Sequence, residues 1–345
     1  MSTAVRQSAL LAGVCCLSLS PFASASDILD TPAIIAPLAI DSLILDIGTS
    51  NDRAIAVGDR GHVLVSESRS DWRQVEVPTQ VMLTAVTAVG NDAWAVGHDH
   101  MILHSADGGL SWEVQNSFKG SDGPLLDVLF LDEQRGFAIG AYGAFLATED
   151  GGQSWSDEFI SDRVNRAAPT DEGDDDGMDD ASGLASTDMG DEEGDPHLNA
   201  IVGTDAGLMI LAEAGSAFRS IDDGASWTRL ELPYGGSMFG GLALDNGEII
   251  AFGLRGNVYR TADLGETWTP MDSGTNASLF GGVALSGGRA VMVGAGGAVV
   301  LAPAGSNTLR LLNFQEGGGM SAVLAVSDVQ FVVGGDNGID SYSPN

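Results

Sequence analysis

The sequence predicts an all-β fold, a single seven-bladed β-propeller with four-stranded antiparallel blades and an acidic loop insertion. Two observations predict it: a turn motif recurs seven times with a period near 41 residues, and short apolar runs separated by glycine, asparagine and aspartate fill each period. A period of about 40 to 45 residues with four short strands per unit is typical of propeller blades. With 44% hydrophobic residues, the 345-residue chain can also bury a substantial core.

Residues 1–25 have the features of a secretory signal peptide. An apolar run too short to span a bilayer follows the positive charge of Arg6, and a small-residue cleavage site ends at Ala25. Cleavage there would remove Cys15 and Cys16, the two cysteines of the chain, so the mature protein would have no disulfides. We therefore expect a periplasmic or secreted protein without membrane insertion.

Residues 26–42 are expected to contain a closing strand. The last repeat, 317–345, holds 29 residues where the others hold about 41, so its outermost strand is missing. The apolar stretch 33–40 is expected to add that strand to the last blade and so close the ring. Such an exchange would remove an exposed sheet edge, which otherwise invites association with other chains.

Residues 43–345 are expected to form the propeller. Each repeat pairs a small residue after two apolar residues with a second position three or four residues later, as Gly58 with Gly61; the small residue is glycine in six copies and Ala212 in the fourth. The second position falls at Gly61, His100, Gly143, Gly215, Gly256, Gly297 and Gly338. Five of the intervals between these positions are 39 to 43 residues, and the interval of 72 holds an insertion. The predicted blades span about 43–78, 81–118, 124–160, 197–233, 236–274, 276–314 and 317–345.

The insertion covers residues 161–196. From position 171 onward it holds twelve acidic residues and no lysine or arginine, a composition that predicts disorder because such a segment cannot collapse. Glu172, Asp174 and Asp176 also match positions one, three and five of an EF-type calcium loop, although position twelve is Gly183 rather than glutamate. Weak calcium binding at these three residues is the alternative to a purely disordered loop, and no other cofactor is expected.

A second motif follows the repeated turn in four of the copies. It places a hydroxyl residue, Asp, Gly, a second hydroxyl residue and Trp at offsets zero, two, four, six and seven. In a hairpin turn the aspartate accepts hydrogen bonds from backbone amides, the glycine supplies a positive φ, and the tryptophan fills the space between sheets. The motif resembles the Asp-box, or bacterial neuraminidase (BNR) repeat, and we expect a structural role. Its residues are Ser105, Asp107, Gly109, Trp112, Thr148, Asp150, Gly152, Trp155, Ser220, Asp222, Gly224, Trp227, Thr261, Asp263, Gly265 and Trp268.

The charge balance excludes whole classes of partner. Fifteen basic residues stand against 48 acidic ones, giving a formal net charge of −33. Nucleic acids and anionic membrane surfaces bind through basic side chains, so this chain would repel both. Without the twelve acidic residues of the insertion the charge is still −21, so the acidity is global.

Three histidines, His98, His100 and His104, lie within seven residues of the second repeat. If the turn is extended, His98 and His100 share one face and, with His104, provide nitrogen ligands for zinc or copper. The other interpretation is that they are ordinary turn and surface histidines. The sequence leaves both open.

The Asp-box also invites comparison with sialidases and other glycosidases. A sialidase needs three arginines on separate blades and a Tyr–Glu nucleophile pair. The Phe/Tyr-Arg-Ile-Pro motif of sialidases is absent, and no pair of carboxylates stands out in the sequence. We therefore expect no enzymatic activity, with a BNR-repeat glycoside hydrolase or a glycan-binding propeller as the alternative.

The complete repeat is clearest from Ala95 to Trp112 and from Ala138 to Trp155. It resembles the photosystem II stability/assembly factor family of seven-bladed propellers over nearly the whole mature chain. The resemblance implies a non-catalytic assembly scaffold at a membrane; bacterial relatives without photosynthesis are exported, and some are encoded beside RND-type exporters. It therefore predicts a monomer that binds a protein partner, a membrane or envelope complex. The arginine-rich docking patch of the family has no clear counterpart in this chain.

The candidate partner-binding residues are Arg60, Tyr142 and Arg255. They occupy equivalent turn positions just before a repeated glycine, which predicts loops near the top of the channel. Binding residues are disproportionately found on loops that a rigid scaffold positions.

Overall fold

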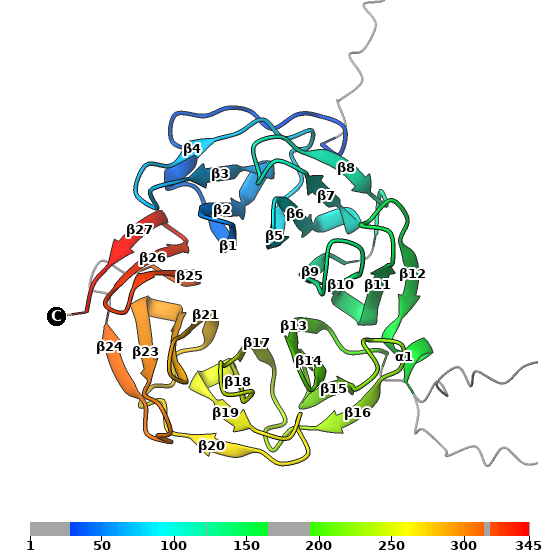
Figure 1. The fold of residues 1–345 in the computed structure, drawn as a ribbon. Helices are drawn as coiled ribbons and strands as arrows, with labels where there is room; N and C mark the ends of the chain where they lie inside the picture. Colours follow the sequence, from blue (N-terminus) through cyan, green and yellow to red (C-terminus); the bar gives the residue numbers. More distant parts are fainter. Residues whose placement is uncertain (1–27, 122, 165–193, 314–317, 345) are drawn as a thin grey trace, which may run out of the picture.

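The computed structural model describes residues 28–121, 123–164, 194–313 and 318–344. In these ranges seven antiparallel sheets surround a central axis, which confirms the predicted seven-bladed propeller (Figure 1). Six sheets have four strands and the last has three. The predicted signal peptide, residues 1–25, lies outside the described ranges, as do Glu172, Asp174 and Asp176 of the insertion.

Each sheet is a meander whose strands follow one another from the channel outward. Blade one consists of β1 (Ile44–Ser50), β2 (Arg53–Gly58), β3 (Val63–Ser66) and β4 (Arg73–Gln74), and blade two of β5 (Leu83–Val89), β6 (Asp92–Gly97), β7 (Ile102–Ser105) and β8 (Glu113–Asn116). Blade three consists of β9 (Leu125–Phe130), β10 (Gly136–Gly140), β11 (Ala144–Thr148) and β12 (Ser156–Phe159), and blade four of β13 (Leu198–Thr204), β14 (Gly207–Ala212), β15 (Ser216–Ser220) and β16 (Thr228–Glu231).

The remaining blades continue the pattern. Blade five consists of β17 (Met238–Ala243), β18 (Ile249–Gly253), β19 (Val258–Thr261) and β20 (Thr269–Met271), and blade six of β21 (Leu279–Leu285), β22 (Arg289–Gly294), β23 (Ala298–Ala302) and β24 (Arg310–Asn313). Blade seven consists of β25 (Met320–Ser327), β26 (Gln330–Gly335) and β27 (Gly338–Tyr342). The short elements outside the sheets are η1 (Ala39–Asp41), η2 (Asp59–Gly61), η3 (His98–His100), η4 (Ala141–Gly143), α1 (Ile160–Arg163), η5 (Leu254–Gly256) and η6 (Ala295–Gly297).

The core lies between the blades. The second strand of each blade is buried almost throughout, because a neighbouring sheet covers each of its faces. One cluster joins Ile55 and Val65 of blade one to Leu103 and Trp112 of blade two. This packing explains why the repeats show continuous apolar runs, which are typical of strands buried on both faces, instead of alternation.

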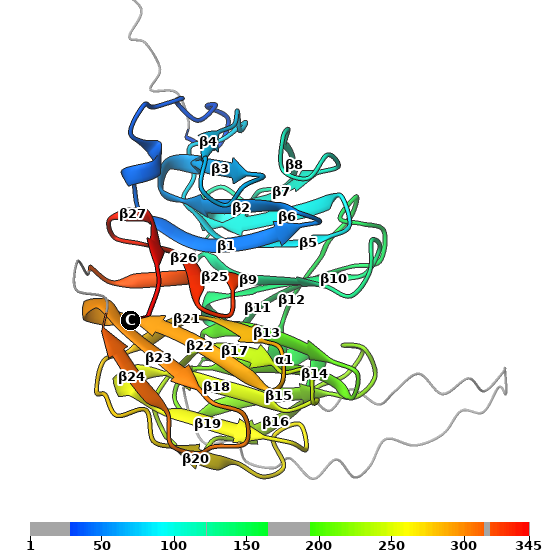
Figure 2. The same cartoon turned by 60° about the vertical axis from the view of Figure 1, so that its left-hand side comes forward.

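The ring closes by packing of blade seven against blade one (Figure 2). Ile44 and Leu64 form one apolar cluster with Ala322 and Val332 across this junction. The Ser321 hydroxyl donates a hydrogen bond to the Ile44 carbonyl. No strand between 33 and 40 joins blade seven in the described part of the chain, so the predicted strand exchange is wrong.

The segment 28–36 instead forms an arm on the outer side of blade one (Figure 1). The Ala33 amide donates to the Val77 carbonyl at 2.9 Å, and the Gln80 amide to the Ile28 carbonyl at 2.9 Å. Pro37, in the middle of the predicted strand, has no N–H to donate to a ladder, which explains why no strand forms there. After the arm, η1 lies against β27.

The meander gives the ring two distinct faces. One face carries the turns between second and third strands and the connections from blade to blade; we call it the connection face. The opposite face carries the turns between first and second strands and those between third and fourth strands. Because the Asp-box residues follow the third strands, we call this second face the Asp-box face.

Candidate functional site: the channel, the Asp-box face and the connection face

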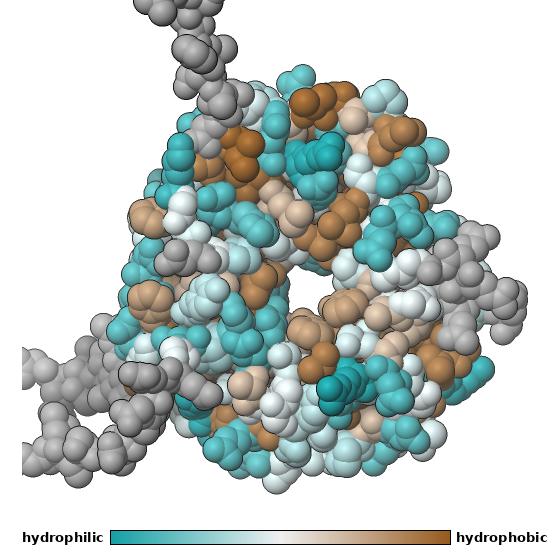
Figure 3. Space-filling model, turned by 180° about the vertical axis from the view of Figure 1, so that it is seen from behind, coloured by the Kyte–Doolittle hydropathy of each residue, from teal (hydrophilic) through white to brown (hydrophobic). Residues whose placement is uncertain are grey.

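The central channel is lined by the start of each innermost strand. Figure 3 shows its opening at the centre of the ring, and the cavity measures about 180 Å³. The seven inner strands contribute Leu45 and Asp46, Thr84 and Ala85, Leu126 and Asp127, Asn199 and Ala200, Phe239 and Gly240, Phe280 and Gly281, and Ser321 and Ala322. At this level the pairing of every inner strand with the second strand has a register shift. A bulge there re-aims side chains and backbone groups toward the next blade.

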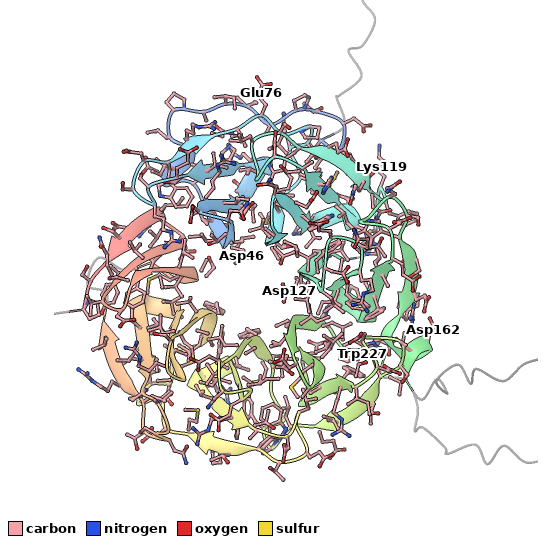
Figure 4. All side chains as sticks on the ribbon, viewed as in Figure 1. Asp46, Glu76, Lys119, Asp127, Asp162 and Trp227 are labelled. Carbon is pink, nitrogen blue, oxygen red and sulfur yellow. The ribbon has the colours of Figure 1, made fainter. Side chains whose placement is uncertain are left out.

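Two channel carboxylates, Asp46 and Asp127, bind the neighbouring blade (Figure 4). Asp46 Oδ2 accepts the Val86 amide of blade two at 2.9 Å, and Asp127 Oδ2 accepts the Ile201 amide of blade four at 2.8 Å. The second oxygen of each carboxylate accepts the amide of the residue that follows it, at 2.8 Å. Both carboxylates therefore tie one blade to the next.

The same two groups have raised pKa values. Burial raises the pKa of Asp46 to about 6, against the hydrogen bonds from Val86 and Ile47. Burial raises the pKa of Asp127 to about 7, and the charge of Asp46 adds to the shift against the amide hydrogen bonds. Each side chain is enclosed by protein except where it borders the channel. A shifted pKa in a cavity can mark either a functional site or a structural network. The hydrogen bonds of Asp46 and Asp127 to backbone amides of the next blade favour the structural role.

Other inner strands use neutral side chains for the same purpose. The Thr84 hydroxyl donates to the Leu125 carbonyl of blade three at 2.7 Å, and the Asn199 amide donates to the Met238 carbonyl of blade five at 2.8 Å. Ser321 donates across the closure to blade one. Asp46 and Asp127 thus belong to a polar girdle that joins successive blades. Neither Asp46 nor Asp127 is among the residues predicted from the sequence; the available signal was a lone aspartate inside an apolar inner strand.

The four Asp-boxes lie at the turns between the third and fourth strands of blades two to five. In blade two, Asp107 Oδ1 accepts the Ser111 amide at 2.9 Å and Oδ2 accepts the Ser111 hydroxyl at 2.7 Å. The Ser105 hydroxyl donates to Asp107 at 2.8 Å and accepts the Gly109 amide at 2.8 Å. The boxes around Asp150, Asp222 and Asp263 repeat these bonds.

These turns also contact the preceding blade. Gly109 has φ +85°, and a Cβ there would lie 2.7 Å from Ile55 Cδ1 of blade one. Trp227, labelled in Figure 4, is buried and meets Phe145 of blade three edge-on, with ring centroids 5.8 Å apart. The hydrogen bonds hold the aspartates ionised: desolvation opposes them at Asp107, yet bonds from Ser111 and Ser105 lower its pKa to about 2. Each Asp-box aspartate is therefore engaged in hydrogen bonds within its own turn, which gives it a structural role.

Arg60, Tyr142 and Arg255 occupy equivalent positions on the connection face. They lie in η2, η4 and η5 with left-handed φ angles of 54°, 56° and 58°, and all three side chains are exposed. None lines the central cavity, so the expectation that they lie near the top of the channel is wrong: each sits one strand farther out. They belong to blades one, three and five, and the structure does not bring them together.

Tyr142 borders a groove between blades two and three. Three exposed aromatic side chains define this aromatic groove: Phe118, Tyr142 and Phe159, which are 60%, 54% and 55% exposed. The cavity measures about 590 Å³ and is also lined by His100, Ser121, Gly123, Ala141, Ala144 and Asp157. Phe118 and Phe159 were not among the sequence candidates, because only the fold brings the ends of β8 and β12 beside the turn of Tyr142.

The three histidines do not form a metal site. His98 and His100 lie in the turn η3, whereas His104 in β7 contacts Asp92 Oδ1 at 2.7 Å through Nε2. Burial lowers the pKa of His100, against the charges of Asp157 and Asp99. Across the described ranges, no group of three or more His, Cys, Asp or Glu side chains is arranged to hold a metal ion. In the same ranges no helix is long and apolar enough to span a bilayer.

Comparisons with known proteins agree with this fold. The structure is similar to YCF48 from Cyanidioschyzon merolae, with a TM-score of 0.66, 17% identity and coverage of 90% of this chain and 98% of that one. A second YCF48 structure, described as bound to D1 peptide, gives a TM-score of 0.65 at 16% identity over 90% and 96% of the chains. A streptogramin B lyase gives a TM-score of 0.69 at 13% identity over 93% and 100%. At these identities the likeness concerns the fold.

The sequence comparisons cover less of the chain. No family model matches it. It is 45% identical over 47 residues to the photosystem II assembly protein Ycf48 of two Synechococcus strains, JA-3-3Ab and JA-2-3B'a(2-13). This match covers 13% of the chain and 14% of the length of either relative. Sequence and structure thus both confirm a resemblance to the photosystem II assembly factors of the propeller class.

Proposed function

We propose that this chain is an exported, non-catalytic scaffold that binds a protein partner on its connection face and helps to assemble or stabilise a membrane or envelope complex. The observation that carries the proposal is the aromatic groove of Phe118, Tyr142 and Phe159. Its large apolar side chains are exposed on a rigid ring, and exposed aromatic clusters are typical of protein-binding surfaces.

The resemblance to Ycf48 supports the choice of a protein partner. One of the similar structures is described as bound to a D1 peptide, so a propeller of this shape can hold a polypeptide segment. The photosynthetic partner itself does not follow from this resemblance. An exporter or another envelope complex agrees with the predicted signal peptide at residues 1–25.

The use of the carboxylates supports a non-catalytic role. Asp46 and Asp127 accept backbone amides of adjacent blades, and Asp107 accepts turn amides and hydroxyls. Glycoside hydrolysis needs two carboxyl groups that face a substrate, one as acid and one as base or nucleophile. The described carboxyl groups with the largest pKa shifts are instead engaged in holding the framework together.

Capture from detergent-solubilised envelopes tests this proposal. The mature chain, residues 26–345, is immobilised, and bound proteins are identified by mass spectrometry with and without excess free chain as competitor. We expect a defined set of membrane proteins that the free chain displaces. If the free chain displaces none of the captured proteins, the proposal is contradicted.

An activity screen tests the alternative. The purified chain is incubated with sialosides, β-glucans and a streptogramin B antibiotic, the last because of the lyase-like propeller among the similar structures. We expect no turnover of any of them. Robust turnover that is lost in a channel or groove variant would replace the scaffold with an enzyme.

A further inference from the structure

We propose that the aromatic groove binds a short extended peptide segment of the partner in which a large apolar side chain is flanked by lysine or arginine. This inference rests on the proposed scaffold function and names the site and the chemistry of its ligand. Four observations support it: the internal comparison of blades, the fixed backbone of the groove, its charge, and its size.

The fold does not require aromatic residues at this place. Phe159 stands opposite Ala144 in the β11–β12 ladder. The equivalent position, four residues after the tryptophan of the Asp-box, holds Asn116 in blade two, Glu231 in blade four and Asp272 in blade five. The repeat itself therefore shows that this position accepts polar residues, so an exposed phenylalanine there needs another reason.

Tyr142 departs from the repeat in the same way. The equivalent left-handed turn position holds Arg60 in blade one, Asp99 in blade two, Ala214 in blade four and Arg255 in blade five. A left-handed conformation favours glycine, asparagine and aspartate, and a bulky aromatic residue there is uncommon. Two unusual aromatic residues on one blade line the same groove.

Backbone contacts hold the groove open in advance. The Phe118 amide donates to the Asp99 carbonyl at 2.7 Å, and the Phe159 amide donates to Asp162 Oδ2 at 3.0 Å. The Tyr142 amide donates to His197 Nδ1 at 3.2 Å, and the centroids of the Tyr142 and His197 rings are 4.6 Å apart. Such an arrangement reduces the entropy lost on binding, because the aromatic side chains stand on a fixed backbone.

The charge around the groove favours a cationic ligand. Asp157 lines it, and Asp99 lies close to His100 in its wall. Asp162, labelled in Figure 4, accepts the Phe159 amide. Lys119 follows Phe118 at the outer edge of blade two and is not among the lining residues. With a formal charge of −33 on the whole chain, the surrounding field also attracts cations. Lysine or arginine beside an aromatic face adds a cation–π contact.

The size of the groove fits a side chain and its neighbours. Its volume of about 590 Å³ lies within the usual range of ligand sites, about 300–1,000 Å³. The aromatic side chains cover an apolar anchor, and Asp157, which also lines the groove, faces the flanking charge. A free amino acid would leave much of this surface uncovered, whereas an extended peptide of a few residues covers it.

Peptide binding to the mature chain tests the inference. The probe is a fluorescein-labelled peptide, Gly-Ser-Lys-Phe-Lys-Ser-Gly, at a fixed concentration. Its fluorescence polarisation is measured while the protein concentration is raised into the millimolar range. Two matched peptides replace Phe by Ala or both Lys by Glu. We expect saturable binding of the first peptide, at least about tenfold weaker binding of the other two, and weaker binding of the first at high salt.

Matched protein variants locate the site. Tyr142→Asn with Phe159→Asn removes both aromatics and introduces residues that the turn and ladder positions accept. The control, Ala214→Asn with Glu231→Asn, makes the same change at the equivalent positions of blade four. We expect at least a tenfold loss of affinity in the first variant and none in the control, with unchanged circular dichroism spectra and melting temperatures within a few degrees.

Several outcomes would overturn the inference. They are no saturable binding of the lysine–phenylalanine peptide, equal affinity for the Ala or Glu peptide, and equal affinity of the Tyr142/Phe159 variant. A membrane would be the ligand of the groove if the peptide does not bind and phosphatidylcholine vesicles bind to the wild type but not to the Tyr142/Phe159 variant. If the variant still captures the envelope partner, the scaffold function stands and only the groove is refuted.

Discussion

Two sets of aspartates in the described part of the chain have opposite pKa shifts. Asp46 and Asp127 at the channel have raised pKa values because burial outweighs their backbone hydrogen bonds. The Asp-box residue Asp107 has a lowered pKa because its hydrogen bonds outweigh desolvation. The two groups therefore make opposite contributions to the dependence of stability on pH.

Asp127 is expected to make the protein less stable as the pH rises from about 4 to 8. Its folded-state pKa of about 7 lies above the ordinary value of 3.8, so the folded state binds the proton more tightly, and this stabilisation is lost across that window. In Asp127→Asn this dependence disappears. The loss of stability from pH 5 to pH 8 should therefore shrink by on the order of 2 kcal/mol, allowing for contact with the channel.

Urea unfolding of wild type and Asp127→Asn at pH 5 and pH 8 measures this difference. Asp46 contributes in the same direction and stays in both proteins, so only the change between them is assigned to Asp127. A stability difference that is the same at both pH values would contradict a raised pKa at Asp127.

Asp107→Ala is expected to show the opposite trend. The wild-type carboxylate stabilises the turn above pH 3.8 and loses this effect as the pH falls toward its folded-state pKa of about 2. At pH 7 the substitution removes charge-assisted bonds to Ser111 and Ser105, which should cost about 1–3 kcal/mol. Thermal unfolding at pH 7 and pH 3 measures the cost, and a cost that grows toward pH 3 would refute the structural role.

At the scale of elements, the sequence predicts the blades well and the connections between blades poorly. The period near 41 residues and the turn glycines place every sheet, since these signals are local and repeat seven times. A lone aspartate in an apolar inner strand marks Asp46 and Asp127 in the sequence, but their role in the polar girdle could not be predicted, because their partners lie on the next blade. Phe118 and Phe159 were missed for the same reason, since only the fold brings them beside Tyr142.

The predicted closing strand failed for a different reason. The apolar composition of 33–40 favours a strand, but Pro37 interrupts any ladder, and the preceding segment satisfies its backbone on blade one. Thr79 is fully buried there: its hydroxyl donates to the Ile28 carbonyl at 3.1 Å and accepts the Val81 amide at 3.1 Å. The arm thus satisfies its backbone groups on blade one and buries Leu29 and Ala33, while Ile34 and Ile35 stay exposed.

Thr79→Val tests the anchoring of the arm. The substitution keeps the shape of the side chain but removes both hydrogen bonds of the hydroxyl, to the Ile28 carbonyl and from the Val81 amide. This loss should destabilise the protein by about 1–3 kcal/mol. Hydrogen exchange of the amides of Ala33 and Ala36, measured by mass spectrometry of peptides, should accelerate. The comparable change Thr84→Val in the girdle is the control and should leave arm exchange unchanged. Unaltered exchange in Thr79→Val would show that the arm is held elsewhere.

At the scale of the whole molecule, a ring with a formal charge of −33 is under strong self-repulsion. Ion pairs such as Arg135 with Asp132 and Asp223 relieve it locally. The remaining acidity keeps nucleic acids and anionic membranes away and attracts basic segments of other proteins. It therefore restricts which partners can reach the connection face.

Added salt is expected to stabilise the fold. Raising sodium chloride from 0.05 to 0.5 M shortens the Debye length from about 14 Å to about 4 Å and screens the repulsion. The urea midpoint should rise, with a gain in unfolding free energy on the order of 1 kcal/mol. A midpoint that falls with salt would mean that local ion pairs outweigh the global charge.

Site-specific photo-crosslinking in intact cells that produce the full chain shows whether the connection face binds a protein partner. A photoreactive phenylalanine replaces Tyr142 on the connection face or, in the control, Ile221, which is 77% exposed on the Asp-box face. We expect a discrete adduct with one envelope protein from position 142 and none from position 221. Equal adducts from both positions, or no adduct from position 142, would contradict it.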